Sequence, residues 1–143
     1  HEVVRRLEEN KPLQKITINT QPGLPLVRLD KVMLETVLYN LLSNAVRYTE
    51  PQHKIDLVAR AYTDTMELIV EDNGPGFPAE EVKYIFQKVY RLKDTSVSGT
   101  GLGLSIVKGF TEAMGGTVEL ETPVGGGARF ILRFPVERSN IQT

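Results

Sequence analysis

"KIDLVARAYTDTMELIVED", from Lys54 to Asp72, contains two β-rich runs joined by the short polar connection "TDT". A connection this short favours an antiparallel hairpin. The later runs "TVELET" and "ARFILRF" flank "PVGGG" in the same way, and "KITINT" near the start alternates Ile16 and Ile18 with polar residues, as a half-buried strand does. Together these runs predict a mixed, mostly antiparallel sheet.

Helical patterns alternate with these strands along the chain. The strongest, "KVMLETVLYNLLSNAVRY" (31–48), follows Asp30, a residue type suited to a helix N-cap. "AEEVKYIFQ" (79–87) also has a helical pattern, and so has a stretch from the glycine-rich segment near Gly101 to about Met114. A short helix is also predicted in the first ten residues. The helix predicted at 31–48 has apolar residues at helical spacing, so we expect it to pack on a core through one face. The residues of this face are Leu34, Val37, Leu38, Leu41, Leu42 and Ala45. We therefore expect an α/β (α+β) two-layer sandwich, with about three helices on one face of the sheet.

Size and composition indicate one globular domain. The chain has 143 residues, of which 41% are hydrophobic and 24% charged, and we expect its core to span about 13–135. A formal net charge of -1 argues against binding to nucleic acid, and the absence of cysteine excludes disulfides and thiolate metal sites. No apolar run approaches the ~18 residues of a membrane span, so we expect no membrane insertion. The chain begins at His1 without a Met, and we expect it to be a piece of a larger protein.

The segment "SGTGLGLSIVKGF" (98–110) has three glycines at alternate positions before a predicted helix. Free N–H groups at a helix N-terminus favour an anion such as phosphate. Neither common phosphate motif fits, because Leu104 stands where the dinucleotide pattern needs glycine, and Gly109 follows Lys108 where the P-loop needs Ser or Thr. A nucleotide bound here would need another architecture.

A polar stripe interrupts the apolar helix at 31–48. Asn40, Asn44 and Arg47 are spaced by four and three residues and share one face. An asparagine oxygen suits Mg²⁺, which commonly shares its coordination sphere with waters and substrate phosphates. A solvated face, or amides bonded to nearby backbone, explains the stripe equally well, and the helix alone leaves these readings open.

"EDNGPGFP" (71–78) places Asp72 where an apolar strand meets a loop. A carboxylate there could accept a hydrogen bond from the exocyclic amine of a base, while Gly74 and Gly76 let the backbone approach a flat ring. An ordinary Asn-Gly turn is the alternative. A calcium loop is disfavoured, because Lys83 stands where the loop needs a bidentate Glu.

Four segments in series resemble the motifs of sensor histidine kinase catalytic domains. "NLLSNAVRYT" is similar to the N box, "EDNGPGFP" to the first glycine box, "IFQKVYRL" to the F box and "GTGLGLSIVKG" to the second glycine box. The resemblance covers about 13–135 and implies the Bergerat fold of the wider ATPase and kinase superfamily that includes gyrase and MutL. Within the family, "GLPLVRLD" is similar to the corresponding stretch of KdpD-like kinases.

The resemblance implies ATP and Mg²⁺ as ligands. Asp72 would bond the adenine amino group, with Gly74 and Gly76 giving the base backbone room. Asn44 would ligate Mg²⁺ with help from Asn40. The other implied contacts are made by Arg47 and Arg91 with the phosphates and by Tyr48 with the purine.

The resemblance also implies a lid over the nucleotide. Gly99, Gly101 and Gly103 would shape this lid and the start of the following helix, and the nucleotide-binding segment would also include Thr100, Leu102 and Leu104. Phe86 and Tyr90 would anchor the other end of the lid. Plain core packing is an equal alternative for Phe86.

The implied activity is that of a protein-histidine kinase. Neither His1 nor His53 has the acidic, Arg-Thr-Pro context of a phosphoacceptor, so the partner would be a histidine-bearing helical dimerisation domain of the same full-length kinase, followed by a response regulator. Such a domain would lie on the cytoplasmic side of a membrane-bound sensor. The alternatives are a hydrolytic ATPase of the same superfamily or a nucleotide-gated interaction module. Those ATPases carry a carboxylate at the position that corresponds to Asn40. The amide of Asn40 cannot act as a general base.

Overall fold

The computed structural model describes residues 16–20, 29–49, 53–76, 103–123 and 126–136. Five strands and two helices lie within these ranges. The strands are β1 (Ile16–Thr20), β2 (Ile55–Ala61), β3 (Thr65–Asp72), β4 (Thr117–Glu121) and β5 (Ala128–Pro135), and the helices are α2 (Lys31–Tyr48) and α3 (Gly103–Ala113). The stretches 1–10 and 79–87, both predicted to be helical, lie outside the described residues.

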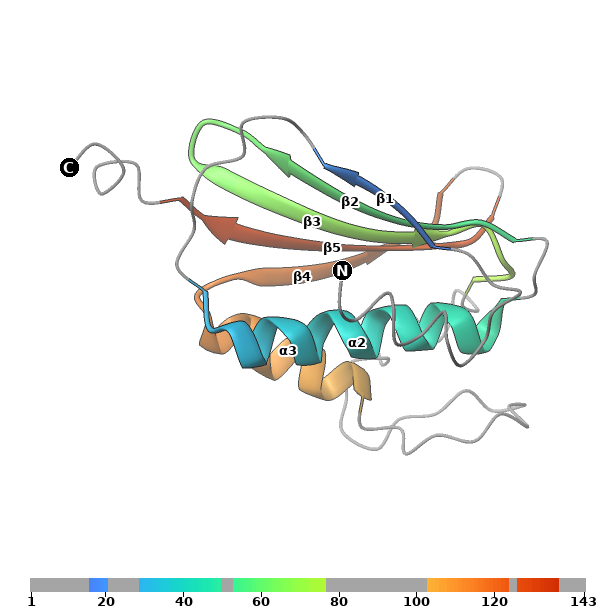
Figure 1. The fold of residues 1–143 in the computed structure, drawn as a ribbon, viewed down its shortest axis with the longest axis horizontal. Coiled ribbons are helices and arrows are strands. Elements are labelled where there is room, and N and C mark those ends of the chain that lie inside the picture. The colour runs from blue at the N-terminus through green and yellow to red at the C-terminus, as the bar shows by residue number, and fades with distance from the viewer. Residues whose placement is uncertain (1–15, 21–28, 50–52, 77–102, 124–125, 137–143) are drawn as a thin grey trace.

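The sheet is mixed and mostly antiparallel, as predicted. Its strand order is β1-β2-β3-β5-β4; β1 runs parallel to β2, and every other neighbouring pair is antiparallel. Figure 1 shows α2 and α3 side by side beneath one face of this sheet. The two-layer α/β architecture is therefore confirmed.

The core lies between the sheet and the helices because strand side chains alternate in direction. On β3 and β5 the register pairs Met66 with Phe134, Leu68 with Leu132 and Val70 with Phe130, and all six residues are buried. On α2 the predicted apolar face is in the core or packed against it. Its buried members are Val37, Leu41, Leu42 and Ala45, and its partly buried members are Leu34 and Leu38.

The ends of both helices follow from local sequence. Asp30 caps α2, since its Oδ1 accepts a hydrogen bond from the N–H of Met33 at 2.9 Å. Past the end of α3, Gly115 has a φ of 85°, and the N–H of Gly116 donates to the carbonyl of Thr111 at 2.9 Å. A glycine in this conformation is a common way for a helix to end. The predicted cap at Asp30 is confirmed.

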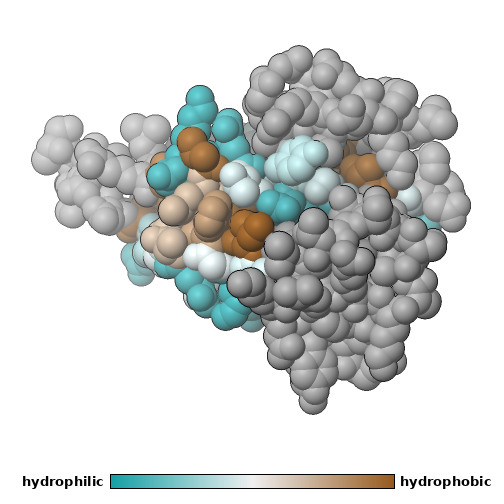
Figure 2. Space-filling view, turned by 90° about the horizontal axis from the view of Figure 1, so that it is seen from below, coloured by the Kyte–Doolittle hydropathy of each residue, from teal (hydrophilic) through white to brown (hydrophobic). Residues whose placement is uncertain are grey.

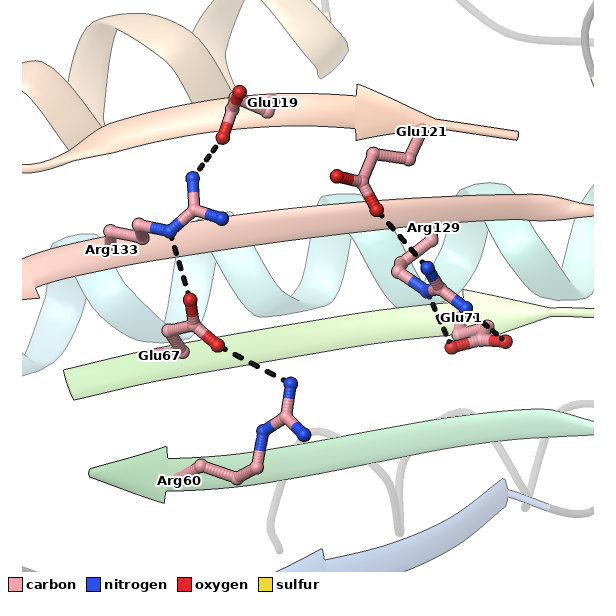
Figure 3. Close-up of polar contacts among 7 residues, drawn as sticks. All are labelled: Arg60, Glu67, Glu71, Glu119, Glu121, Arg129 and Arg133. Atoms are coloured by element: carbon pink, nitrogen blue, oxygen red, sulfur yellow. Dashed lines mark hydrogen bonds and ion pairs between the residues drawn. The ribbon is translucent and has the colours of Figure 1, made fainter. Parts of the chain in front are cut away.

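The outer face of the sheet carries ion pairs (Figure 3). Arg133 on β5 bonds Glu67 on β3 and Glu119 on β4, and Glu67 also contacts Arg60 on β2. Arg129 bridges Glu71 and Glu121 in the same manner. A shallow depression of about 500 Å³ lies over this face, but its charged side chains are paired with one another. Asp72 is not among its lining residues.

The outer surface of the helix layer is partly apolar. Figure 2 looks onto this layer and shows apolar residues (brown) gathered between hydrophilic ones (teal). On α3 and just after it, Leu104, Phe110 and Met114 pack against the core and are only partly buried. Neither of the two described helices is long and apolar enough to cross a membrane.

Candidate functional site

Several element ends meet around Asp72. Asp72 is the last residue of β3 and pairs with Ile55 at the start of β2 and with Ala128 at the start of β5. The end of α2 reaches the same place, because Thr49 lies against the loop that follows β3 at Gly74. Residues distant in the sequence therefore form one corner of the domain around a single carboxylate.

The Asp72 carboxylate is half-buried and held by backbone. Its Oδ1 accepts a hydrogen bond from the N–H of Gly74 at 2.9 Å, and the N–H of Ala128 also donates to the carboxylate. Burial raises the pKa of Asp72, an effect that the nearby charge of Glu71 reinforces and that the two N–H donors and His53 oppose. The net shift of this pKa is upward. A partly desolvated acceptor fixed in direction is suited to a strong hydrogen bond with one ligand donor.

Two of the predicted glycines stand where side chains do not fit. A Cβ on Gly74 would lie 2.8 Å from Cγ2 of Thr49 and 3.2 Å from Oδ1 of Asp72. Gly76 has a φ of 73°, and a Cβ there would lie 2.5 Å from the carbonyl oxygen of Gly127. The loop after β3 therefore packs closely beside Asp72 because it lacks these side chains.

The turn that begins this loop is anchored to β2. Asn73 donates from its N–H to the carbonyl of Lys54 at 3.2 Å, and its Oδ1 accepts from the N–H of Lys54 at 2.5 Å. The Asn-Gly dipeptide is thus tied to Lys54, next to β2, and the hydrogen bond from the N–H of Gly74 to Oδ1 of Asp72 is the local contact of an Asx turn. The described residues therefore form a local turn here, as the alternative interpretation expected, beside the half-buried carboxylate.

The polar residues of α2 lie along the helix that ends at this corner. Asn40 is half-buried, and its Nδ2 donates to the carbonyl of Thr36 at 2.8 Å, the backbone contact that the alternative reading anticipated. Its Oδ1 is a separate acceptor. Asn44 is half-buried one turn later, and Arg47 and Tyr48 are in the last turn before Thr49. The structure therefore brings the asparagine helix and Asp72 to the same part of the fold.

The lid side of the predicted site falls mainly in 77–102. This range is outside the described residues and contains Phe86, Tyr90, Arg91, Gly99, Thr100, Gly101 and Leu102. Gly103 is the first residue of α3, so the predicted helix after the glycine segment is present. Leu104 is partly buried and packs against the core.

The contribution of the connection between β4 and β5 was not predicted. The pattern "PVGGG" predicted only a hairpin turn, whereas Gly127 and Ala128 contact the end of β3. The run of glycines was the available signal. Its contact with Asp72 depends on which strands pair, and the order β3-β5-β4 is not readable from the run itself.

The chemistry of the corner fits an adenine nucleotide and an accompanying Mg²⁺. Asp72 offers an acceptor for an amine, and the missing side chains of Gly74 and Gly76 let the loop after β3 pack closely against Thr49 and Gly127 beside this carboxylate. Within the described ranges no three His, Asp or Glu side chains gather to hold a metal ion. A cation here would rely on an amide oxygen such as that of Asn44, together with phosphates and water, which is a ligand set suited to Mg²⁺.

Known proteins with similar sequences are sensor proteins. The chain is 44% identical over 111 residues to the sensor protein RstB of Escherichia coli K12, a match that covers 76% of this chain and 25% of RstB. It is 40% identical over 111 residues to the sensor protein KdpD of Rathayibacter rathayi, covering 77% of this chain and 13% of that protein. The chain spans a quarter or less of each relative. A KdpD among the relatives agrees with the resemblance of "GLPLVRLD".

Solved structures with a similar fold include histidine kinases. The catalytic domain of the histidine kinase ThkA, in a nucleotide-free form, has a TM-score of 0.79 and 29% identity, covering 94% of this chain and 92% of that one. Full-length ShkA in complex with AMPPNP also has a TM-score of 0.79 and 29% identity, covering 94% of this chain and 29% of ShkA.

The family model described as histidine kinase-, DNA gyrase B-, and HSP90-like ATPase matches residues 29–138. This range contains both described helices, strands β2 to β5 and the corner around Asp72. The chain therefore belongs to the family of histidine kinase-, DNA gyrase B- and HSP90-like ATPases, as a catalytic domain of the sensor histidine kinase kind.

Proposed function

We propose that this domain binds Mg-ATP with its base at Asp72 and donates the γ-phosphoryl group to a histidine on a separate helical dimerisation domain. A response regulator would then receive the group. The domain would work on the cytoplasmic side of a membrane-bound sensor kinase. The observation that carries the proposal is the half-buried Asp72 carboxylate, fixed by Gly74 beside a loop with no room for side chains.

The residues around this corner have distinct roles in the proposal. Asp72 accepts the adenine amino group, Gly74 and Gly76 let the loop after β3 pack closely beside the base, and Tyr48 lies against the ring. Asn44 holds Mg²⁺, which neutralises phosphate charge when bound, and Asn40 supports the phosphate end. The remaining phosphate and lid contacts are assigned to Arg47, Arg91, Phe86, Tyr90 and 99–104. The complex of ShkA with AMPPNP, an ATP analogue, supports the assignment of a nucleotide to this fold.

Phosphoryl transfer suits this set of residues because it requires mainly positioning and charge stabilisation from the protein. The bond between the γ-phosphorus and the bridging oxygen of ADP breaks as a phosphorus–nitrogen bond forms to the acceptor imidazole. No nucleophile from this domain takes part. A hydrolytic ATPase would need a base for water, and Asn40, which already donates to the carbonyl of Thr36, carries no carboxylate.

Nucleotide binding to Asp72→Asn tests the proposal. An amide in place of the carboxylate removes a charge-assisted acceptor, a loss of roughly 1.5 to 3 kcal/mol. Calorimetry should show ATP binding weakened at least tenfold, with an unchanged circular dichroism spectrum. The matched control is Glu71→Gln, which changes the neighbouring carboxylate on the opposite face of β3, where Glu71 pairs with Arg129. That variant should bind ATP like the unmodified chain. Equal affinity of the unmodified chain for ATP and GTP would contradict the adenine assignment.

A further inference from the structure

The connection between β4 and β5 lies against the end of β3 and the loop that follows it. Gly127 has a φ of 100°, a conformation that L side chains rarely adopt. A Cβ built on Gly127 would overlap the carbonyl oxygen of Asp72 and lie 3.0 Å from Cα of Asn73. The backbone at Gly127 is thus in direct contact with the backbone that carries the carboxylate.

This contact places a second donor on the carboxylate. Ala128, the next residue, is 3% exposed and pairs with Asp72 across β3 and β5. Its N–H lowers the pKa of Asp72, as does the N–H of Gly74, which donates to Oδ1 of Asp72 from the loop after β3. One N–H group from the loop after β3 and one from the start of β5 therefore favour the charged form of the same carboxylate.

Gly127 also fixes the loop after β3. Its carbonyl oxygen stands where a side chain on Gly76 would be, so the two segments are packed backbone to backbone. Any side chain at 127 must push the start of β5 away from β3. This shift would move the N–H of Ala128, and it would also move the Gly127 carbonyl oxygen that packs against Gly76. The orientation of Asp72 thus depends on a residue outside its own motif.

We propose that Gly127 is a positioning residue for Asp72: its missing side chain lets the start of β5 close on the carboxylate and aim it at the adenine amine. This inference rests on the proposed function for the identity of the ligand. The arrangement of Gly127, Ala128 and Asp72 does not depend on it.

Gly126 provides a matched control. It has a φ of 105°, so alanine there imposes similar backbone strain, but its Cβ would meet only the carbonyl oxygen of Gly74 at an ordinary 3.7 Å. Both alanine variants should lower the melting temperature. Only Gly127→Ala should weaken ATP binding, by tenfold or more, whereas Gly126→Ala should stay within about threefold of the unmodified chain. Equal losses of affinity for the two variants would overturn the proposal.

A double-variant cycle separates positioning from general damage to the site. If Gly127 acts through Asp72, Gly127→Ala should change ATP affinity less than twofold once Asp72→Asn is present. The same tenfold loss in both backgrounds would show that Gly127 acts elsewhere. If Asp72→Asn alone leaves ATP binding unchanged, the proposed function fails, and this result is distinct from a failure of the cycle.

A measurement on the unmodified chain covers the case in which Gly127→Ala does not fold. In a pH titration followed by nuclear magnetic resonance, the amide of Ala128 should shift with the same midpoint as the Asp72 carboxyl carbon. This shift should disappear in Asp72→Asn. An Ala128 amide that is insensitive to the titration of Asp72 would overturn the proposal without any nucleotide being added.

Discussion

Two buried threonines, Thr49 and Thr111, differ in what their hydroxyl groups contact. The Thr49 hydroxyl donates to the carbonyl of Ala45 at 2.7 Å. The Thr111 side chain is fully buried in α3, and among the described residues its Oγ1 has no hydrogen-bond partner. A buried hydroxyl without a partner carries an uncompensated desolvation penalty.

We predict opposite effects when valine replaces each threonine. Thr111→Val removes the unpaired oxygen at nearly constant volume and should raise the free energy of unfolding by about 1 kcal/mol. Thr49→Val removes a made hydrogen bond and should lower that free energy by about 1 kcal/mol. Urea unfolding followed by circular dichroism measures both. A destabilised Thr111→Val variant would mean that the hydroxyl has a partner.

The raised pKa of Asp72 sets a pH dependence of stability. Burial, the main cause, favours the neutral carboxyl, so the pKa of Asp72 in the folded chain lies above its ordinary value of 3.8. The charged form therefore costs folding stability at neutral pH, and this cost is absent below about pH 3.8. Without nucleotide, the stability of Asp72→Asn relative to the unmodified chain should be greatest near neutral pH. The difference should decline as the pH falls through the raised pKa. Thermal unfolding over this range measures it, and a difference that does not vary with pH would contradict the shift.

At the scale of elements, the outer face of the sheet is joined by charged side chains across four strands. Arg133 lies between Glu67 and Glu119, and the Glu67 side chain is only 10% exposed. Loss of Arg133 would leave this nearly buried carboxylate with Arg60 alone, at 3.4 Å. On the helix layer, the pair of Lys108 and Glu112 has side chains 46% and 56% exposed.

We therefore expect unequal effects from removing one cation in each place. Arg133→Met should lower the free energy of unfolding by roughly 1 to 2 kcal/mol, because a hydrogen-bonded and largely desolvated carboxylate loses a partner. Lys108→Met should change it by less than about 0.5 kcal/mol, as exposed pairs on a helix do. Chemical unfolding at low salt provides the comparison. Equal losses in the free energy of unfolding for the two substitutions would show that the burial of Glu67 does not determine the cost of removing its cation.

The described helices and strands were predicted from sequence because residue patterns and capping residues within each segment specify them. The two β-rich runs and the short connection in 54–72 predicted both strands of the hairpin, and Asp30 predicted the start of α2. The sequence did not indicate that β5 lies between β3 and β4, since this order is set by non-local pairing. The role of Gly127 beside Asp72 follows only from that order.

At the scale of the whole molecule, the candidate site is a corner where strand ends meet a helix end. Asp72 and Gly74 were predicted together because they share one motif. That Thr49 from α2 and Ala128 from β5 would meet them was not predictable from spacing, because both contacts depend on how the helix layer and the sheet pack. The packing of the helix layer on the sheet therefore fixes the position of the loop after β3.

Phosphoryl transfer in a reconstituted mixture tests the central claim most directly. The chain is mixed with Mg-ATP labelled at the γ-phosphate and with the proposed partner, a histidine-bearing helical dimerisation domain. With ATP held near the dissociation constant of the unmodified chain, we predict acid-labile, base-stable label on the helical domain, strongly reduced when the chain carries Asp72→Asn and retained with Glu71→Gln. An unlabelled helical domain despite saturating Mg-ATP, or label that persists undiminished with Asp72→Asn, would contradict the account.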